Sequence, residues 1–102
     1  MGTGAVFPLS QEDTAEFCRR WRIRELAVFG SAARGELRPD SDIDVMVEFE
    51  PEAQLGLLQL VRIKHELEDA IGRPVDVIEK GTIRNPYRKA SIERDLTIVY
   101  AA

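Results

Sequence analysis

Two short stretches constrain this chain most: the pair Gly30-Ser31 and, soon after it, the triplet Asp42-Ile43-Asp44. The pair ends an apolar run, and the triplet opens a segment in which apolar and polar residues alternate. Residues two apart in a strand point to the same face, so Asp42 and Asp44 are predicted to project together while the apolar residues between and after them face the other side. The pattern favours a strand with a buried face and an acidic face.

The Gly30-Ser31 pair is suited to bind phosphate. Residues 31–34 have the propensity for a brief helical turn, whose first backbone N–H groups lack partners within the turn. Glycine allows close approach of the backbone, and the serine hydroxyl favours an anion. The alternative is a plain turn between a strand and a helix, which is the commoner meaning of an isolated Gly-Ser pair.

The paired acids indicate a cation site. Two close carboxylates repel and raise each other's pKa unless a cation lies between them, which points to a hard divalent ion such as Mg²⁺ or Mn²⁺. The alternative is a solvated strand face, although strands disfavour Asp. Asp76 interrupts a later apolar run and would complete the site, and accept a proton from an attacking hydroxyl, if its strand lies beside that of Asp42 and Asp44. Otherwise Asp76 simply faces water.

Taken together, these motifs resemble the DNA polymerase beta-like nucleotidyltransferase superfamily and, within it, the minimal nucleotidyltransferase (MNT) group. The resemblance extends over nearly the whole chain and is carried by Gly30-Ser31, residues 32–36, residues 41–44 and Asp76. It implies that Gly30 and Ser31 hold a triphosphate, that Asp42 and Asp44 bind metal, and that Asp76 is the third carboxylate. Arg34 follows the phosphate turn and is a further candidate to contact the triphosphate, or else an exposed arginine.

The resemblance also implies an activity and a partner. An acceptor hydroxyl would attack the α-phosphate of ATP in line and release pyrophosphate, with two Mg²⁺ ions assisting. MNT proteins are commonly antitoxins that work with a helical HEPN partner, an RNase toxin, so the resemblance implies AMPylation of a tyrosine hydroxyl on such a partner. Two alternatives stay open: neutralisation of the partner by binding alone, and nucleotidyl transfer to a small molecule or an RNA end.

The composition limits the size of the fold and the kinds of partner that the chain can bind. The 102 residues, 44% of them hydrophobic, are enough for one domain with one small core. A net charge of −4 and a pI near 5.0 argue against a dedicated nucleic-acid binder, so no direct nucleic-acid contact is expected. Basic residues gather near both ends, and we interpret both groups as solvated helix faces: Arg19, Arg20, Arg22 and Arg24, then Arg84, Arg88, Lys89 and Arg94.

The single cysteine and the N-terminus suggest a compartment. Cys18 has no partner for an intrachain disulfide and is predicted to be a core thiol in a reducing cytosol. The first eight residues lack a basic start and a long apolar stretch, so neither a signal peptide nor a membrane span is expected. We therefore expect a soluble, cytoplasmic protein.

The periodicity predicts an α/β fold, a mixed sheet covered by helices. Ser10 is the expected N-cap of the first helix, and Gly72 the expected stop of the longest one. Helices are predicted at residues 10–21, 31–34, 55–71 and 86–94, and strands at residues 25–29, 42–49, 75–78 and 96–100. Asp40 and Glu48 are interpreted as solvated turn and strand-face residues, and Glu48 is expected to lie nearer the site than Asp40 because it shares the face of Asp44. His65 is assigned to the surface. The direction of each strand is left open by the pattern.

Overall fold

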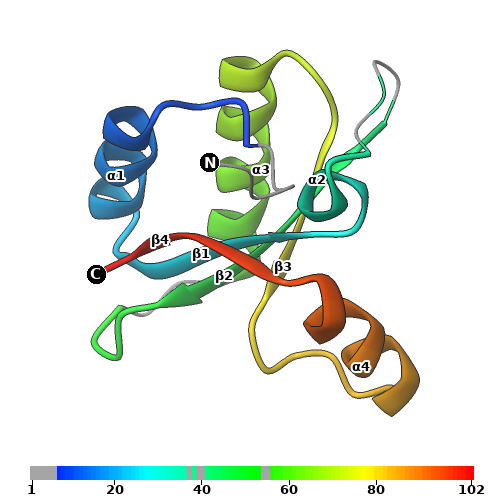
Figure 1. The fold of residues 1–102 in the computed structure, drawn as a ribbon. Helices are drawn as coiled ribbons and strands as arrows, with labels where there is room; N and C mark the ends of the chain where they lie inside the picture. The colour runs from blue at the N-terminus through cyan, green and yellow to red at the C-terminus, as the bar shows by residue number, and fades with distance from the viewer. Residues whose placement is uncertain (1–6, 37, 39–40, 54–55) are drawn as a thin grey trace.

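The computed structural model describes residues 7–36, 38, 41–53 and 56–102 (Figure 1). The predicted alternation of helices and strands is confirmed, with most ends shifted by one or two residues. Three predictions lie outside the described residues: the start of the long helix at Leu55, the turn residue Asp40, and the character of residues 1–6. The elements are α1 (Gln11–Arg20), β1 (Ile23–Phe29), α2 (Ser31–Arg34), β2 (Ile43–Phe49), α3 (Leu57–Ile71), β3 (Val75–Glu79), α4 (Pro86–Asp95) and β4 (Thr97–Ala101).

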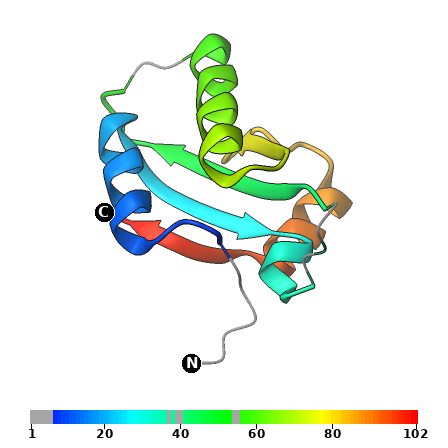
Figure 2. The same cartoon turned by 90° about the horizontal axis from the view of Figure 1, so that it is seen from above.

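The strands form one mixed sheet in the order β3-β2-β1-β4 (Figures 1 and 2). β1 pairs antiparallel with both β2 and β4, whereas β2 and β3 run parallel. The parallel pair is possible because α3 provides the crossover from β2 to β3. The structure thus confirms the mixed sheet and supplies the strand directions that the pattern left open.

Two helices close one face of this sheet. α1 and α3 lie on the same side, while α4 crosses the other side (Figure 1). Phe17 and Cys18 of α1 and Ile63 and Leu67 of α3 join one core with the strands. The strand residues of that core are Ile23, Leu26, Val28, Ile43, Val45, Val47 and Val75. We call this side of the sheet the closed face and the side crossed by α4 the open face.

The ends of the helices follow their sequence signals. The Ser10 side chain caps α1 by accepting a hydrogen bond from the Asp13 N–H at 3.1 Å. Gly72 ends α3 in the left-handed conformation, with φ of 85°, and its N–H donates to the Glu68 carbonyl. Leu57, in the first turn of α3, is 77% exposed, so the apolar stripe of this helix does not pack along its full length.

Cys18 is fully buried in α1, as predicted for a core thiol. Burial raises the pKa of its thiol to about 12 because the ionised form would lose its hydration. The thiol is therefore a small packing group at neutral pH.

Within the described ranges, no helix has both the length and the apolar character to span a bilayer.

Candidate active site

The alternation of side chains along β2 separates a buried set from an acidic set. Ile43, Val45 and Val47 are fully buried in the closed face, whereas Asp44 is half-buried and Asp42, just before the strand, is exposed. The prediction that the apolar residues enter the core while Asp42 and Asp44 share the opposite face is confirmed. Both carboxylates therefore belong to the open face, near the start of β2.

Asp76 lies directly beside this pair. The parallel register of β2 and β3 places Asp44 opposite Asp76. Neighbouring strands are about 4.8 Å apart, and register partners project to the same face, so the two carboxylates share one small region of the open face. The adjacency that the sequence could only assume is confirmed.

The turn at Gly30 and Ser31 lies against Asp44. Gly30 follows Phe29, the register partner of Asp44, and it adopts φ of 71°, which favours glycine. A Cβ at this position would lie 2.6 Å from Oδ2 of Asp44, so only glycine allows this contact between backbone and carboxylate. The half-buried Ser31 then opens α2, with Gly30 as its N-cap residue.

The electrostatics show unbalanced negative charge at this point. The pKa of Asp44 is raised, first by its burial and then by the charges of Asp76 and Asp42, while Arg88 of α4 opposes the shift. Among the described residues, no group of three His, Cys, Asp or Glu side chains is arranged to hold a metal ion by itself. Mg²⁺ usually binds one or two carboxylates together with phosphate oxygens, so this donor set fits a metal that arrives with a triphosphate.

Arg88 is exposed on α4, in line with its interpretation as part of a solvated helix face, and its positive charge also opposes the rise in the pKa of Asp44. The sequence pattern did not indicate this influence on Asp44. The reason is tertiary: α4 follows β3 and then crosses the open face on its way to β4 at the other edge of the sheet (Figure 1). The sequence signal available was only a local excess of positive charge.

Arg34 is oriented by two carboxylates. Its Nε donates to Glu36 at 2.9 Å and its Nη1 donates to Asp95, at the end of α4, at 2.8 Å. The bond to Asp95 connects α2 to α4, and a contact of Arg34 with a triphosphate stays a prediction.

Glu48 lies on the open face further along β2 and pairs with Lys80 at 3.5 Å. His65 is exposed on α3, as expected.

Residues 14–99 match the family described as nucleotidyltransferase domain. The chain belongs to the nucleotidyltransferase domain family. A Methanocaldococcus jannaschii relative named "Putative protein adenylyltransferase MJ1217" is 41% identical over 81 residues, covering 78% of this chain and 80% of the relative. The protein adenylyltransferase MntA of Thermococcus cleftensis is 36% identical over 74 residues, covering 72% of this chain and 73% of MntA.

Solved structures agree with this family assignment. A structure described as a "putative minimal nucleotidyltransferase" is 34% identical, with a TM-score of 0.69 and coverage of 85% of this chain and 86% of that one. A crystal structure described as a toxin-antitoxin with AMP-PNP has a TM-score of 0.74 at 17% identity, over 92% of this chain and 75% of that one. At that identity the likeness concerns the fold alone, which is the minimal nucleotidyltransferase fold expected from the sequence.

Proposed function

We propose that this nucleotidyltransferase is a metal-dependent protein adenylyltransferase. It transfers AMP from ATP to a tyrosine hydroxyl of a helical HEPN-type toxin, and it acts as the antitoxin of that pair. Relatives that share about two fifths of their aligned residues with this chain carry the name protein adenylyltransferase, which supports this class of reaction. A structural neighbour described as a tri-AMPylated HEPN toxin in complex with an MNT antitoxin supports the type of partner.

The observation that carries the proposal is the juxtaposition of Asp44, Asp76 and Gly30. Two carboxylates from parallel strands meet beside a glycine that has no room for a side chain. A purely structural sheet gains nothing from this arrangement, because the raised pKa of Asp44 shows that its charge is disfavoured there. A cation and a phosphate chain would offset that cost.

Each residue then has a role in the transfer. Gly30 and Ser31 would bind the triphosphate, and Asp42 and Asp44, with Asp76, would hold two Mg²⁺ ions, which Mn²⁺ could replace. When bound, the metal would neutralise phosphate charge and lower the pKa of the attacking hydroxyl. The hydroxyl oxygen forms a bond to the α-phosphorus as the bond to pyrophosphate breaks, and Asp76 accepts the hydroxyl proton.

The acidic balance of the chain and the form of the site favour a protein acceptor. A net charge of −4 gives little attraction for nucleic-acid phosphates, which disfavours an RNA acceptor. The carboxylates of the open face are half-buried or exposed, so the hydroxyl of a docked partner can reach them. Because ATP and a reduced Cys18 are both compatible with the cytoplasm, the proposal includes that location.

The decisive experiment incubates the chain with α-labelled ATP, Mg²⁺ and a candidate HEPN-type protein. We expect label on the partner, loss of label with Asp42→Asn, and retained label with the control Glu25→Gln, a substitution near the start of β1, away from Gly30. Binding of the partner should persist in both variants. Full neutralisation of the toxin by Asp42→Asn would instead establish an antitoxin that acts by binding alone.

A further inference from the structure

The open face carries a row of apolar side chains next to the carboxylates. The strand registers align Ile98 of β4 with Ala27 of β1, Ala27 with Met46 of β2, and Met46 with Ile78 of β3. This row follows directly after the row that contains Asp44 and Asp76 along the same strands. Apolar residues on a face that is not part of the main core need another partner.

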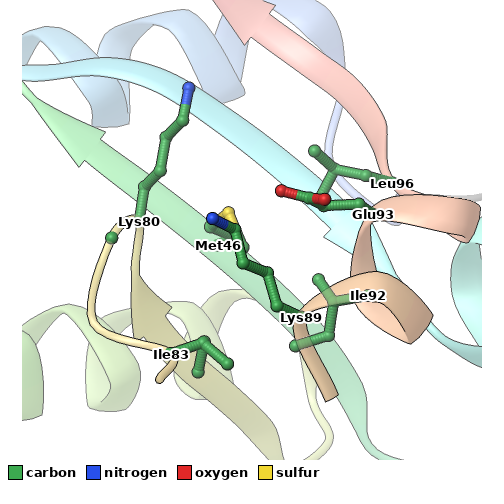
Figure 3. A pocket seen from close by; sticks show the side chains of 8 residues that line it. Met46, Lys80, Ile83, Lys89, Ile92, Glu93 and Leu96 are labelled. Atoms are coloured by element: carbon green, nitrogen blue, oxygen red, sulfur yellow. The ribbon is translucent and has the colours of Figure 1, made fainter. Parts of the chain in front are cut away.

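α4 covers part of this row and leaves a cavity of about 180 Å³ beneath it. Its apolar lining comes from three parts of the chain: Met46 of β2, Ile83 of the segment after β3, and Ile92 and Leu96 from α4 and its end (Figure 3). An apolar cavity of about 150 Å³ in another protein is large enough to bind benzene. The space under α4 is therefore large enough for one aromatic ring.

The position of the cavity relative to the carboxylates indicates which part of the reaction it serves. Gly30 lies at the Asp44 end of β2, whereas Met46 lies two residues further along the strand, roughly 6.6 Å away, on the side opposite Gly30. In an in-line displacement the attacking and leaving oxygens lie on opposite sides of the phosphorus. If pyrophosphate leaves on the Gly30 side, the acceptor approaches from the side of the cavity.

The rim of the cavity is polar. Lys80, Lys89 and Glu93 line it, and Lys80 is held by its ion pair with Glu48 at 3.5 Å. An apolar interior with a few charged groups at its mouth is the usual form of a site for an amphipathic ligand. A phenol ring, apolar along its body and polar at its tip, has this character.

We propose that the cavity between Met46 and α4 binds the aromatic ring of the acceptor residue and directs its hydroxyl along β2 toward Asp44 and Asp76. This inference rests on the proposed function and adds a specificity pocket to it. Met46 and Ile83 would select a tyrosine over serine or threonine, because a short side chain fills none of the cavity. The selection is by burial of apolar surface rather than by hydrogen bonds.

The pocket can be tested without catalysis. The chain contains two methionines, so ¹³C-methyl labelling gives two signals, which a Met1→Leu variant assigns. N-acetyl-tyrosinamide should move the Met46 methyl signal upfield through the ring current, saturating on the order of millimolar concentration. N-acetyl-serinamide should leave the Met46 methyl signal unshifted, and Mg²⁺-ATP should not displace the tyrosine probe.

Two matched variants test whether the change in the Met46 signal arises from binding in the cavity. Ile83→Trp should fill the cavity and weaken the tyrosine probe at least tenfold. Ile98→Trp is the control, since Ile98 belongs to the same apolar row and is 54% exposed but does not line the cavity. The inference is overturned if the tyrosine probe leaves the Met46 signal unmoved, if ATP moves that signal and competes with the probe, or if both Trp variants weaken it equally.

The experiments give different results depending on whether the pocket proposal or the transfer proposal is wrong. Asp44→Asn should abolish label transfer while the tyrosine probe still shifts Met46. If the transfer proposal is wrong, the shift persists but no label reaches any partner. If the pocket proposal is wrong and the transfer proposal is right, the Ile83→Trp variant should label the HEPN-type partner with an unchanged KM for that partner.

Discussion

The two faces of β2 show how one short strand serves two purposes. On the closed face, Ile43, Val45 and Val47 are fully buried against α1 and α3. On the open face, Asp44 is half-buried with a raised pKa, and Met46 borders a cavity. Neighbouring residues of the same strand therefore contribute to different properties, and single substitutions should separate the stability of the fold from the chemistry of the site.

The largest expected effect is on the open face. Asp44→Asn keeps the size of the side chain but removes the charge that would hold metal beside the triphosphate. Transfer of label from ATP should fall by a factor of about 10³ or more, roughly 4 kcal/mol of transition-state stabilisation. Urea unfolding should show an intact cooperative fold. Activity close to that of the unchanged protein would contradict the assignment of Asp44.

Two glycine substitutions test the contact between the Gly30 turn and Asp44. Gly30→Ala introduces both a strained positive φ and a Cβ 2.6 Å from the Asp44 carboxylate, and should destabilise the fold by about 2–4 kcal/mol. Gly72→Ala is the control, because φ is 85° there but no atom lies within 4 Å of the added Cβ. It should cost about 1–2 kcal/mol, the strain of a left-handed conformation for alanine. Equal losses in urea unfolding would show that strain alone matters at Gly30.

A substitution on the closed face should lower the stability of the fold and leave the activity unchanged. Val45→Ala removes two methyl groups from a fully buried site next to Asp44 and should lower the free energy of unfolding by about 2 kcal/mol. At a temperature where the variant is still folded, its rate of label transfer should match that of the unchanged protein. A large loss of activity in the folded variant would mean that the two faces are coupled.

The smallest effect is a difference in pH dependence. Because the folded-state pKa of Asp44 is raised above 3.8, the folded protein binds this proton more tightly than the unfolded chain does. Ionised Asp44 therefore disfavours folding above that raised pKa. Asp44→Asn should be more stable than the unchanged protein near pH 7, with the gain disappearing as the pH falls to 3.8.

Glu68 provides the control of opposite sign. The pKa of Glu68 is lowered below 4.5, mainly by the hydrogen bond from Lys64 and then by the bond from the Val75 N–H. Its contribution to stability is present above pH 4.5 and is lost as the pH falls through the lowered pKa. Glu68→Gln should therefore be less stable than the unchanged protein near neutral pH, and the difference should shrink in acid. Urea titrations from pH 3.5 to 7 measure both variants.

Much of the closed face and of the acidic site could be predicted from the sequence because both depend on local patterns. Alternation in residues 42–47 determined which side chains enter the core, and Gly72 marked the end of α3. The adjacency of Asp76 was only an assumption, because strand order is a tertiary property. The resemblance to the MNT group supplied the fold, and the sheet order confirms it.

The open face was harder to predict where it depends on α4. Residues 86–94 were predicted as a helix, but nothing in their sequence indicated which face of the sheet they would cross. Arg88 is exposed, as its interpretation required, but neither its influence on the pKa of Asp44 nor the cavity beside Met46 has a local sequence signal. The bond from Arg34 to Asp95 joins residues that are 61 positions apart and has no local signal.

The position of β1 in the sheet has a consequence for folding. β1 is the first strand that the structure describes, yet one of its two neighbours is β4, which the sequence supplies only after β2 and β3. While the chain emerges from the ribosome, one side of β1 exposes unpaired backbone groups until β4 has been synthesised. Such an edge can pair with another chain and aggregate, so the nascent protein is expected to depend on chaperones or on rapid docking of β4.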